Sequence, residues 1–319
     1  MEKLLEVKDL KVSFFTDLGE TQAVKDAGFA IEEGDFFGIV GESGSGKSVT
    51  TKSILRLGPS NCRIMGGEIL FQGEDILKKS EAELREIRGG EIAMIFQDSL
   101  SALNPVYTVG NKMVELIRRH TSMTKKEAKA RVLELLTAVG ITDPEKAMRS
   151  YPHELSGGMR QRVMIAMAMS SNPKVLIADE PTTALDVTIQ AQILHLLLEL
   201  QKKNNMSIIL ITHDLGVVAQ TCKRVAVMCG GYVVEEGTVE EIFLNPGHPY
   251  TQALIASMPR VGGTFEQFLE RNLSDGSGNL CPFLNRCKYA DKTCEACLPK
   301  YYESSENHKI LCHRREEEK

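Results

Sequence analysis

One stretch of the chain, GESGSGKS at Gly41–Ser48, constrains the fold more than any other. It follows an apolar run, Asp35–Val40, that is typical of a buried strand, and it leads into Lys47–Leu57, which is typical of a helix. Glycines at this spacing let backbone N–H groups curl around phosphate oxygens, and the start of the helix adds the positive end of its dipole. In this context the motif predicts a phosphate-binding loop. Lys47 is then expected to reach the β- and γ-phosphates and Ser48 to ligate Mg²⁺.

Four further apolar runs are expected to be buried strands, namely Glu91–Gln97, Lys174–Asp179, Ser207–Thr212 and Arg224–Cys229. A strongly amphipathic stretch, Ile189–Lys203, lies between two of them and predicts a helix. Strands that alternate with helices indicate an α/β sheet, in which ligands bind at the strand ends.

The order of these patterns predicts two domains. Helical patterns dominate residues from about 98 to 171, which indicates a helical subdomain inserted into the α/β core of a nucleotide-binding domain, residues 1–261. The composition then shifts to a Gly/Ser/Asn-rich stretch that is typical of a linker. Residues 262–319 are therefore expected to form this linker and a small cysteine-rich segment.

Four polar side chains stand where three of the predicted strands end. Asp179 and Glu180 close one strand, and Gln97 and His213 close two others. A carboxylate at such a position can hold Mg²⁺ and its neighbour can orient an attacking water, although acidic residues can also simply solvate a strand end. With a phosphate loop in the same chain, the metal interpretation is favoured. We expect these side chains to converge on one edge of the sheet.

A second phosphate-binding helix start is predicted at Ser156, Gly157 and Gly158, in the stretch ELSGGMRQR. One ATP does not need two such cradles in one subunit. The spacing therefore favours a dimer in which these residues bind the nucleotide of the other subunit.

In this order the motifs resemble those of the ATP-binding cassette family, over about residues 4–260. Walker A is GESGSGKS, the signature is LSGGM, Walker B is VLIADE, the D-loop is ALD, and the Q-loop and switch residues are Gln97 and His213. Met159 stands at the fifth signature position, where many cassettes have Gln. The resemblance implies a RecA-like P-loop ATPase core with an inserted helical subdomain, and it implies ATP and Mg²⁺ as ligands.

The resemblance also assigns roles to single residues. Catalytic roles fall to Glu180, His213 and Gln97, and Mg²⁺ ligands to Ser48, Gln97 and Asp179. Phe14 matches the aromatic residue that stacks on adenine, with Phe15 as the alternative. The implied nucleotide contacts are Phe14, Gly41, Ser43, Gly44, Ser45, Gly46, Lys47, Ser48, Val49, Ser156, Gly157, Gly158 and Asp186.

Three longer stretches are similar to the ATPases of oligopeptide and dipeptide importers: QDSLSALNPVYTVG, YPHELSGGMRQR and NPGHPYTQALIASMP. This resemblance implies a peripheral subunit on the cytoplasmic face of the cell membrane, dimerised with a paralogous ATPase subunit. It implies two transmembrane permease subunits and, indirectly, an extracytoplasmic substrate-binding protein. A related nickel importer and a soluble cassette acting on nucleic acid or ribosomes are the alternatives. The net charge of −5 gives a nucleic-acid partner no support.

Thiols gather near the end of the chain, at Cys281, Cys287, Cys294, Cys297 and Cys312. The first residues carry scattered charges rather than the apolar core of a secretory signal, so we expect a reducing cytosol, where clustered thiols bind metal more often than they form disulfides. The importer resemblance implies a [4Fe–4S] cluster on the cysteines at 281, 287, 294 and 312. Zinc is the alternative, because Cys294 and Cys297 have the short spacing that zinc favours. Cys297 has no match in the subfamily pattern.

Overall fold

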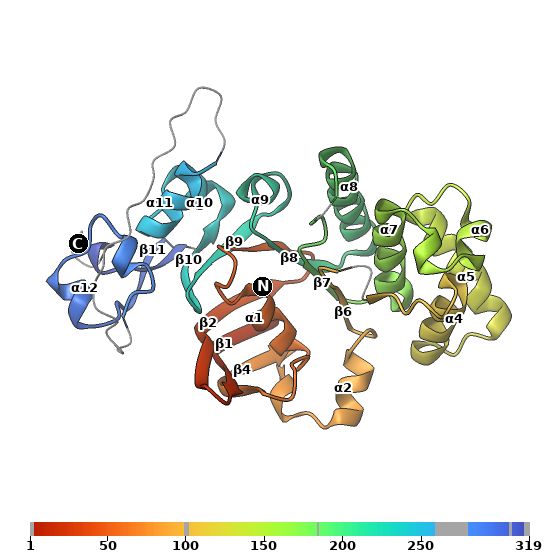
Figure 1. Ribbon diagram of the computed structural model, residues 1–319, viewed down its shortest axis with the longest axis horizontal. Helices are drawn as coiled ribbons and strands as arrows, with labels where there is room; N and C mark the ends of the chain where they lie inside the picture. Colours follow the sequence, from red (N-terminus) through yellow and green to blue (C-terminus); the bar gives the residue numbers. More distant parts are fainter. Residues whose placement is uncertain (1–2, 99–101, 184, 259–279, 306–307, 316–319) are drawn as a thin grey trace. The chain divides into compact units, whose positions relative to one another are not determined.

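The computed structural model describes residues 3–98, 102–183, 185–258, 280–305 and 308–315 (Figure 1). These residues form two compact units. Unit 1 comprises Met1–Glu32, Phe36–Leu77 and Ile211–Lys319, and unit 2 comprises Glu33–Asp35 and Lys78–Leu210. The predicted boundary at residue 261 lies outside the described residues, so the predicted division into domains stays a prediction.

Unit 1 is built on a mixed sheet in the order β5-β4-β1-β2-β10-β9-β3. β1 pairs antiparallel with β2 and β4, whereas β3 and β9 run parallel, from Phe37 opposite Arg224 to Val40 opposite Val227. All five residues of β3 are buried, as its uninterrupted apolar sequence predicts. The strands are β1 (Lys3–Thr16), β2 (Gly19–Glu32), β3 (Phe36–Val40), β4 (Cys62–Phe71), β5 (Glu74–Asp75), β9 (Arg224–Cys229) and β10 (Tyr232–Thr238).

The helices of unit 1 begin at residues that suit helix starts. Thr238 accepts a hydrogen bond from the backbone N–H of Glu241 and forms a capping box, and Pro249 occupies the first turn of its helix, where its missing N–H costs nothing. The helices are α1 (Lys47–Ile54), α9 (Leu215–Thr221), α10 (Val239–Leu244) and α11 (Pro249–Ala256).

Unit 2 combines three strands with most of the helices. β6 pairs parallel with β7, which pairs with β8, and β7 and β8 are buried throughout. Among the described residues of unit 2, only helical elements occur between β6 and β7, which agrees with the predicted helical insertion. The elements are α2 (Glu81–Ile87), β6 (Ile92–Ile95), α4 (Val109–His120), α5 (Lys125–Ala138), α6 (Pro144–Arg149), α7 (Gly157–Ala168), β7 (Val175–Asp179), α8 (Val187–Asn204) and β8 (Ser207–Thr212).

The C-terminal segment, described at residues 280–305 and 308–315, is part of unit 1 and packs on its apolar core. Phe283 and Leu311 are buried in the same apolar core as Val234 and Tyr250. β12 pairs antiparallel with β10, which places Ile310 opposite Glu235. The elements of the segment are α12 (Lys292–Ala296), β11 (Tyr301–Ser305) and β12 (His308–Leu311), with 3₁₀ helices at Leu284–Arg286 and His313–Arg315. Elsewhere in the described chain, 3₁₀ helices lie at Ile76–Lys78, Pro152–Glu154 and Met169–Ser171.

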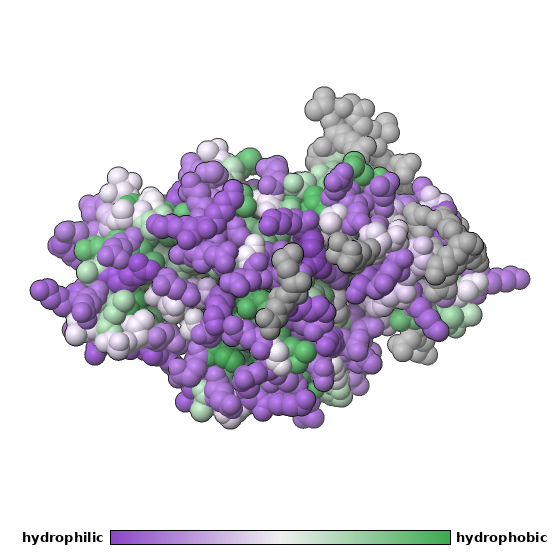
Figure 2. Space-filling model, turned by 180° about the vertical axis from the view of Figure 1, so that it is seen from behind, coloured by the Kyte–Doolittle hydropathy of each residue, from purple (hydrophilic) through white to green (hydrophobic). Residues whose placement is uncertain are grey.

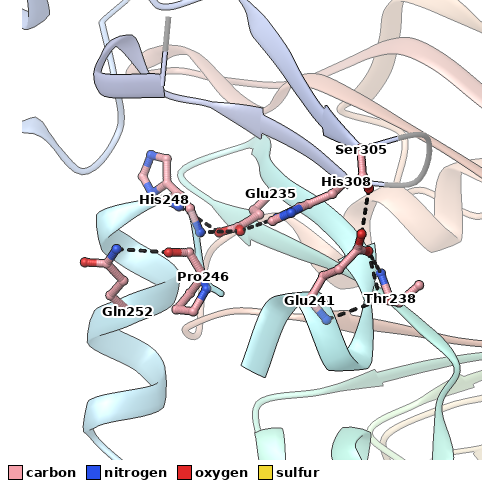
Figure 3. Close-up of polar contacts among 9 residues, drawn as sticks. Glu235, Thr238, Glu241, Pro246, His248, Gln252, Ser305 and His308 are labelled. Atoms are coloured by element: carbon pink, nitrogen blue, oxygen red, sulfur yellow. Dashed lines mark hydrogen bonds and ion pairs between the residues drawn. The ribbon is translucent and has the colours of Figure 1, made fainter. Parts of the chain in front are cut away.

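Polar contacts join this segment to β10 and to the chain that follows it (Figure 3). The carboxylate of Glu235, which is fully buried, lies 2.7 Å from the ring Nε2 of His308 and accepts hydrogen bonds from the backbone N–H groups of Gly247 and His248. Ser305 donates a further hydrogen bond to Glu241. A buried carboxylate is costly unless it is hydrogen-bonded, so these contacts fix the strand pair against β10.

The face shown in Figure 2 is predominantly hydrophilic, with hydrophobic residues scattered in small areas. Within the described ranges, no helix is both long enough and apolar enough to cross a membrane.

Candidate nucleotide site

The loop between β3 and α1 has the backbone of a phosphate cradle. Gly46, which precedes α1, has a φ of 103°, and a Cβ there would lie 2.7 Å from the carbonyl oxygen of Ala23. Only glycine fits both restrictions. Gly44 has a φ of 80°, and a Cβ added to it would meet nothing within 4 Å. The loop is therefore tight on its protein side and open on its outer side.

Lys47, the first residue of α1, is folded back onto this loop. Its ammonium group donates hydrogen bonds to the carbonyl oxygens of Gly41 and Glu42, each at 2.8 Å, and only 5% of the residue is exposed. A buried lysine needs such partners to stay charged. A phosphate entering the loop can replace these carbonyl oxygens with stronger, charged acceptors.

Ser45 also fits a phosphate. It is 4% exposed, and its hydroxyl has no hydrogen-bond partner within the described part of the chain. A buried hydroxyl without a partner is unfavourable. Together with the open outer side at Gly44, this hydroxyl suits an anion with several acceptor oxygens.

A cavity of about 640 Å³ adjoins the start of α1. Phe14, Ser48 and Val49 line it. Phe15 is not among its lining residues, and the guanidinium of Arg63 lies 5.2 Å from the centre of the Phe15 ring. The geometry favours Phe14 over Phe15 as the residue that stacks on a base.

We expect Phe14→Ala to weaken ATP binding by about 5- to 100-fold, because stacking of a base on an aromatic ring contributes roughly 1–3 kcal/mol. Phe15→Ala is the matched control, since it removes a ring of the same size from the next position, and it should change ATP affinity less than twofold. Titration with a fluorescent ATP analogue measures both. A larger loss in Phe15→Ala would assign the stacking role to that residue instead.

Unit 2 places Gln97 and Glu180 in contact. The side-chain amide of Gln97 donates a 2.8 Å hydrogen bond to Oε2 of Glu180, and the hydroxyl of Thr183 donates another to the same oxygen at 2.9 Å. Glu180 has a φ of 46°, which is uncommon for a residue other than glycine. Asp179, the last residue of β7, is 1% exposed. Two of the four predicted strand-end residues, Gln97 and Glu180, are thus joined directly.

His213 follows β8 and belongs to unit 1, where it is exposed. The predicted convergence of His213 with the residues of unit 2 therefore stays a prediction.

The signature residues start helix α7. Ser156 is the N-cap, and its hydroxyl accepts a hydrogen bond from the N–H of Met159 at 3.3 Å. A Cβ added to Gly158 would lie 3.1 Å from the side chain of Ile189 in α8, so a larger residue would push these helices apart. Asp186 caps α8 by accepting a hydrogen bond from the N–H of Ile189. The two glycines leave the N–H groups of the first turn accessible to an anion.

Two residues that sequence reasoning did not assign, Tyr250 and Arg286, also contact the phosphate loop. The backbone N–H of Glu42 donates to the hydroxyl of Tyr250 at 2.9 Å, and the carboxylate of Glu42 pairs with Arg286. Tyr250 and Arg286 lie 208 and 244 residues along the chain from Glu42, and no local pattern signals such a contact.

The predicted metal cysteines lie at different depths. Cys287 and Cys312 are buried, Cys281 and Cys294 are partly buried, and Cys297 is exposed. Burial, together with smaller contributions from nearby Cys312, Cys287 and Cys294, raises the pKa of Cys281 to about 12. Among the described residues no group of three or more His, Cys, Asp or Glu is arranged to hold a metal ion. The predicted iron–sulfur site is therefore not confirmed.

Comparison with known protein families gives two matches. The ABC transporter family matches residues 24–183, and the C-terminal region of oligopeptide/dipeptide transporters matches residues 234–294. The chain is 56% identical to the oligopeptide transport ATP-binding protein OppD of Bacillus subtilis (strain 168), over 84% of this chain and 75% of the relative. It is 48% identical to the dipeptide transport ATP-binding protein DppD of the same organism, over 98% of this chain and 95% of the relative.

Solved structures agree with this result. The dimeric ATP-binding cassette MJ0796 in a post-hydrolysis state, bound to ADP and Pi, superposes with a TM-score of 0.67 at 29% identity, over 74% of this chain and 98% of that one. The cassette cbiO1 of Clostridium perfringens gives a TM-score of 0.64 at 31% identity, over 77% and 92% of the two chains. The expected P-loop ATPase fold is confirmed, and the chain belongs to the ABC transporter family as an ATPase of the oligopeptide/dipeptide transport group.

Proposed function

We propose that this chain binds and hydrolyses ATP to drive import of dipeptides or oligopeptides. The observation that carries the proposal is the match to a dipeptide transport ATP-binding protein along 98% of the chain. The open phosphate loop and the unpartnered Ser45 hydroxyl support it independently, because both fit a polyphosphate.

Each group of residues would have a separate task. The backbone of Gly41–Ser48 and the ammonium of Lys47 bind the phosphates, and Phe14 stacks on the base. Ser48, Gln97 and Asp179 supply oxygens of the kind that Mg²⁺ prefers.

Glu180 would orient the attacking water and accept its proton, while Gln97 and Thr183 hold its carboxylate. His213 would donate a hydrogen bond to the γ-phosphate. The positive φ of Glu180 would set the direction in which its side chain leaves the backbone.

The start of α7 would act on a second subunit. Ser156, Gly157 and Gly158 would bind the γ-phosphate held by the partner ATPase, with Asp186 at the same interface. The dimeric solved cassettes support a dimer. We propose that the partner is a paralogous ATPase and that the pair lies on the cytoplasmic face of the membrane. Two permease subunits would carry the peptide, delivered by an extracytoplasmic binding protein.

Reconstitution tests this function. The chain is co-expressed with candidate paralogue, permease and binding-protein subunits, and ATP hydrolysis is measured in proteoliposomes with a dipeptide, a longer peptide or Ni²⁺. We expect peptides to stimulate hydrolysis and to accumulate in the vesicles, while Ni²⁺ does neither. Stimulation by Ni²⁺ alone would overturn the peptide assignment. Full ATPase activity with RNA or ribosomes, and none with permeases, would overturn the transporter role.

We further propose that Cys281, Cys287, Cys294 and Cys312 hold a [4Fe–4S] cluster. Burial raises the pKa of the Cys281 thiol, and nearby Cys312, Cys287 and Cys294 contribute to this shift, which supports a common site for the four thiols. Zinc, which thiolates bind at about 2.3 Å, is the alternative group for these cysteines.

A bound cluster would supply folding energy to a segment that has little core of its own. α12 and β11 bury no side chain, and β12 buries only His308, Ile310 and Leu311. The four thiolates would then tie these elements together from the inside.

A further inference from the structure

In the described part of the chain, the C-terminal segment contacts the phosphate loop at Glu42. Its carboxylate accepts two parallel hydrogen bonds from the guanidinium of Arg286, at 2.9 and 2.8 Å. Its backbone N–H donates to the hydroxyl of Tyr250 at 2.9 Å. Two side chains from beyond residue 248 thus hold both the main chain and the side chain of one loop residue.

Glu42 is also the residue on which the centre of the loop depends. Its carbonyl oxygen accepts hydrogen bonds from the ammonium of Lys47 at 2.8 Å and from the N–H of Ser45 at 3.2 Å. A rotation of the peptide at Glu42 would therefore move the Lys47 ammonium and the Ser45 amide, two groups of the proposed phosphate loop. The orientation of Glu42 sets the orientation of the binding groups.

Tyr250 and Arg286 are themselves held firmly. Tyr250 is 1% exposed, and its ring packs edge-on against Phe283 at 5.4 Å. The guanidinium of Arg286 lies over both rings, 5.1 Å from the centre of Phe283 and 5.9 Å from that of Tyr250. These contacts restrict the arginine to the side that faces Glu42.

His248 connects the same arrangement to the cysteine segment. Its Nδ1 accepts a hydrogen bond from the N–H of Tyr250 at 3.0 Å, and its Nε2 lies 3.8 Å from the sulfur of Cys281. With Nδ1 as the acceptor, the proton sits on Nε2 and points to the sulfur.

We propose that Arg286 and Tyr250 are positioning residues for ATP, which act on the phosphate loop through Glu42 and so couple nucleotide affinity to the C-terminal segment. The proposal rests on the nucleotide site proposed above. The Arg286–Glu42 pair is partly exposed, with 30% and 47% of the side chains accessible, and exposed pairs add little stability. The two parallel hydrogen bonds instead fix the orientation of the Glu42 carboxylate relative to the Arg286 guanidinium.

The test measures MgATP binding to the full-length chain by calorimetry, and hydrolysis in the assembled transporter. We expect Arg286→Gln and Glu42→Gln each to raise the dissociation constant and KM for ATP by about three- to tenfold, the scale of one charge-assisted contact. The value of kcat should change less than twofold. The double variant should bind ATP about as well as the single variant with the lower affinity. The reason is that both substitutions remove the same interaction.

Glu42→Gln distinguishes a positioning role of Arg286 from direct electrostatic attraction between Arg286 and the phosphates. If Arg286 only attracted the phosphates, removal of the neighbouring carboxylate would strengthen ATP binding, whereas positioning requires both variants to weaken it. Opposite signs for the two variants would therefore overturn the proposal. Tyr250→Phe, which deprives the Glu42 N–H of its acceptor, should also weaken binding. Lys309→Gln is the matched control, since it removes a cation from β12 of the same segment, and it should bind as the wild type does.

Two further measurements separate positioning from loss of folding. Thermal unfolding should show the variants folded, and amide hydrogen exchange should be faster at Gly44–Ser48 than in the wild type. If Arg286→Gln does not fold, Arg286→Lys keeps the charge without the fork and should still weaken binding. Wild-type protein that binds no ATP would refute the nucleotide site itself. Wild-type binding with unchanged affinity in both single variants would refute only the coupling.

Discussion

Glu180→Gln should bind ATP with normal affinity and hydrolyse it about 100- to 1,000-fold more slowly, the usual scale for the loss of a positioned general base. The substitution preserves the size of the side chain and the acceptor oxygen for Gln97 and Thr183, which hold Oε2 at 2.8 and 2.9 Å. It removes only the negative charge that can take a proton from water. Single-turnover hydrolysis in the assembled transporter measures the effect.

Glu199→Gln is the matched control for this prediction. It makes the same chemical change in unit 2. Glu199 is exposed on α8, and its carboxylate lies 3.2 Å from the ring Nε2 of His195. Its turnover should equal that of the wild type. Turnover of Glu180→Gln within threefold of the wild type would remove Glu180 from the catalytic role.

Cys287→Ser should lose its iron almost completely and should destabilise the C-terminal segment. Cys287 is 9% exposed and lies in the apolar core beside Phe283 and Leu311, so its replacement removes a ligand from the inner side of the proposed cluster. Wild-type protein purified without oxygen should be brown, with broad absorption near 400 nm and about four irons per chain. The variant should be colourless.

Cys297→Ser is the control, because this thiol is exposed and lies 4.0 Å from the ring of His313. It should keep the colour and the iron of the wild type. Colourless wild-type protein with one zinc and no iron would refute the cluster. Equal iron loss in both variants would show that Cys297 is a ligand and that the proposed set of four is wrong.

The sequence was most informative where strands are buried on both faces. The runs that became β3, β7, β8 and β9 are continuously apolar, and their glycine and acidic boundaries mark the ends clearly. The antiparallel part of unit 1 was not predicted. β1 and β2 alternate buried and exposed residues irregularly, with several register shifts between them, so their apolar pattern is too weak to recognise.

At the candidate nucleotide site, too, the sequence predicted only the residues that lie next to a recognisable strand. Lys47, Gln97 and Glu180 could be assigned because each stands at a fixed distance from a recognisable strand. The role of Arg286 could not, because its contact with Glu42 depends on how the C-terminal segment packs on Tyr250 and Phe283. The left-handed backbone of Glu180 was also hidden, since side-chain patterns carry no signal for one φ angle.

The long sequence separation between Glu42 and Arg286 has a consequence for synthesis. A ribosome adds about 5–20 residues per second, and 244 residues separate the two partners. Roughly 12 to 50 s therefore pass between translation of the phosphate loop and translation of the arginine that holds it. During most of that interval the nascent loop has neither partner. Tyr250 is translated near the end of it, and Arg286 only at its end. ATP affinity should therefore mature late, after the strands of the cassette have already been made.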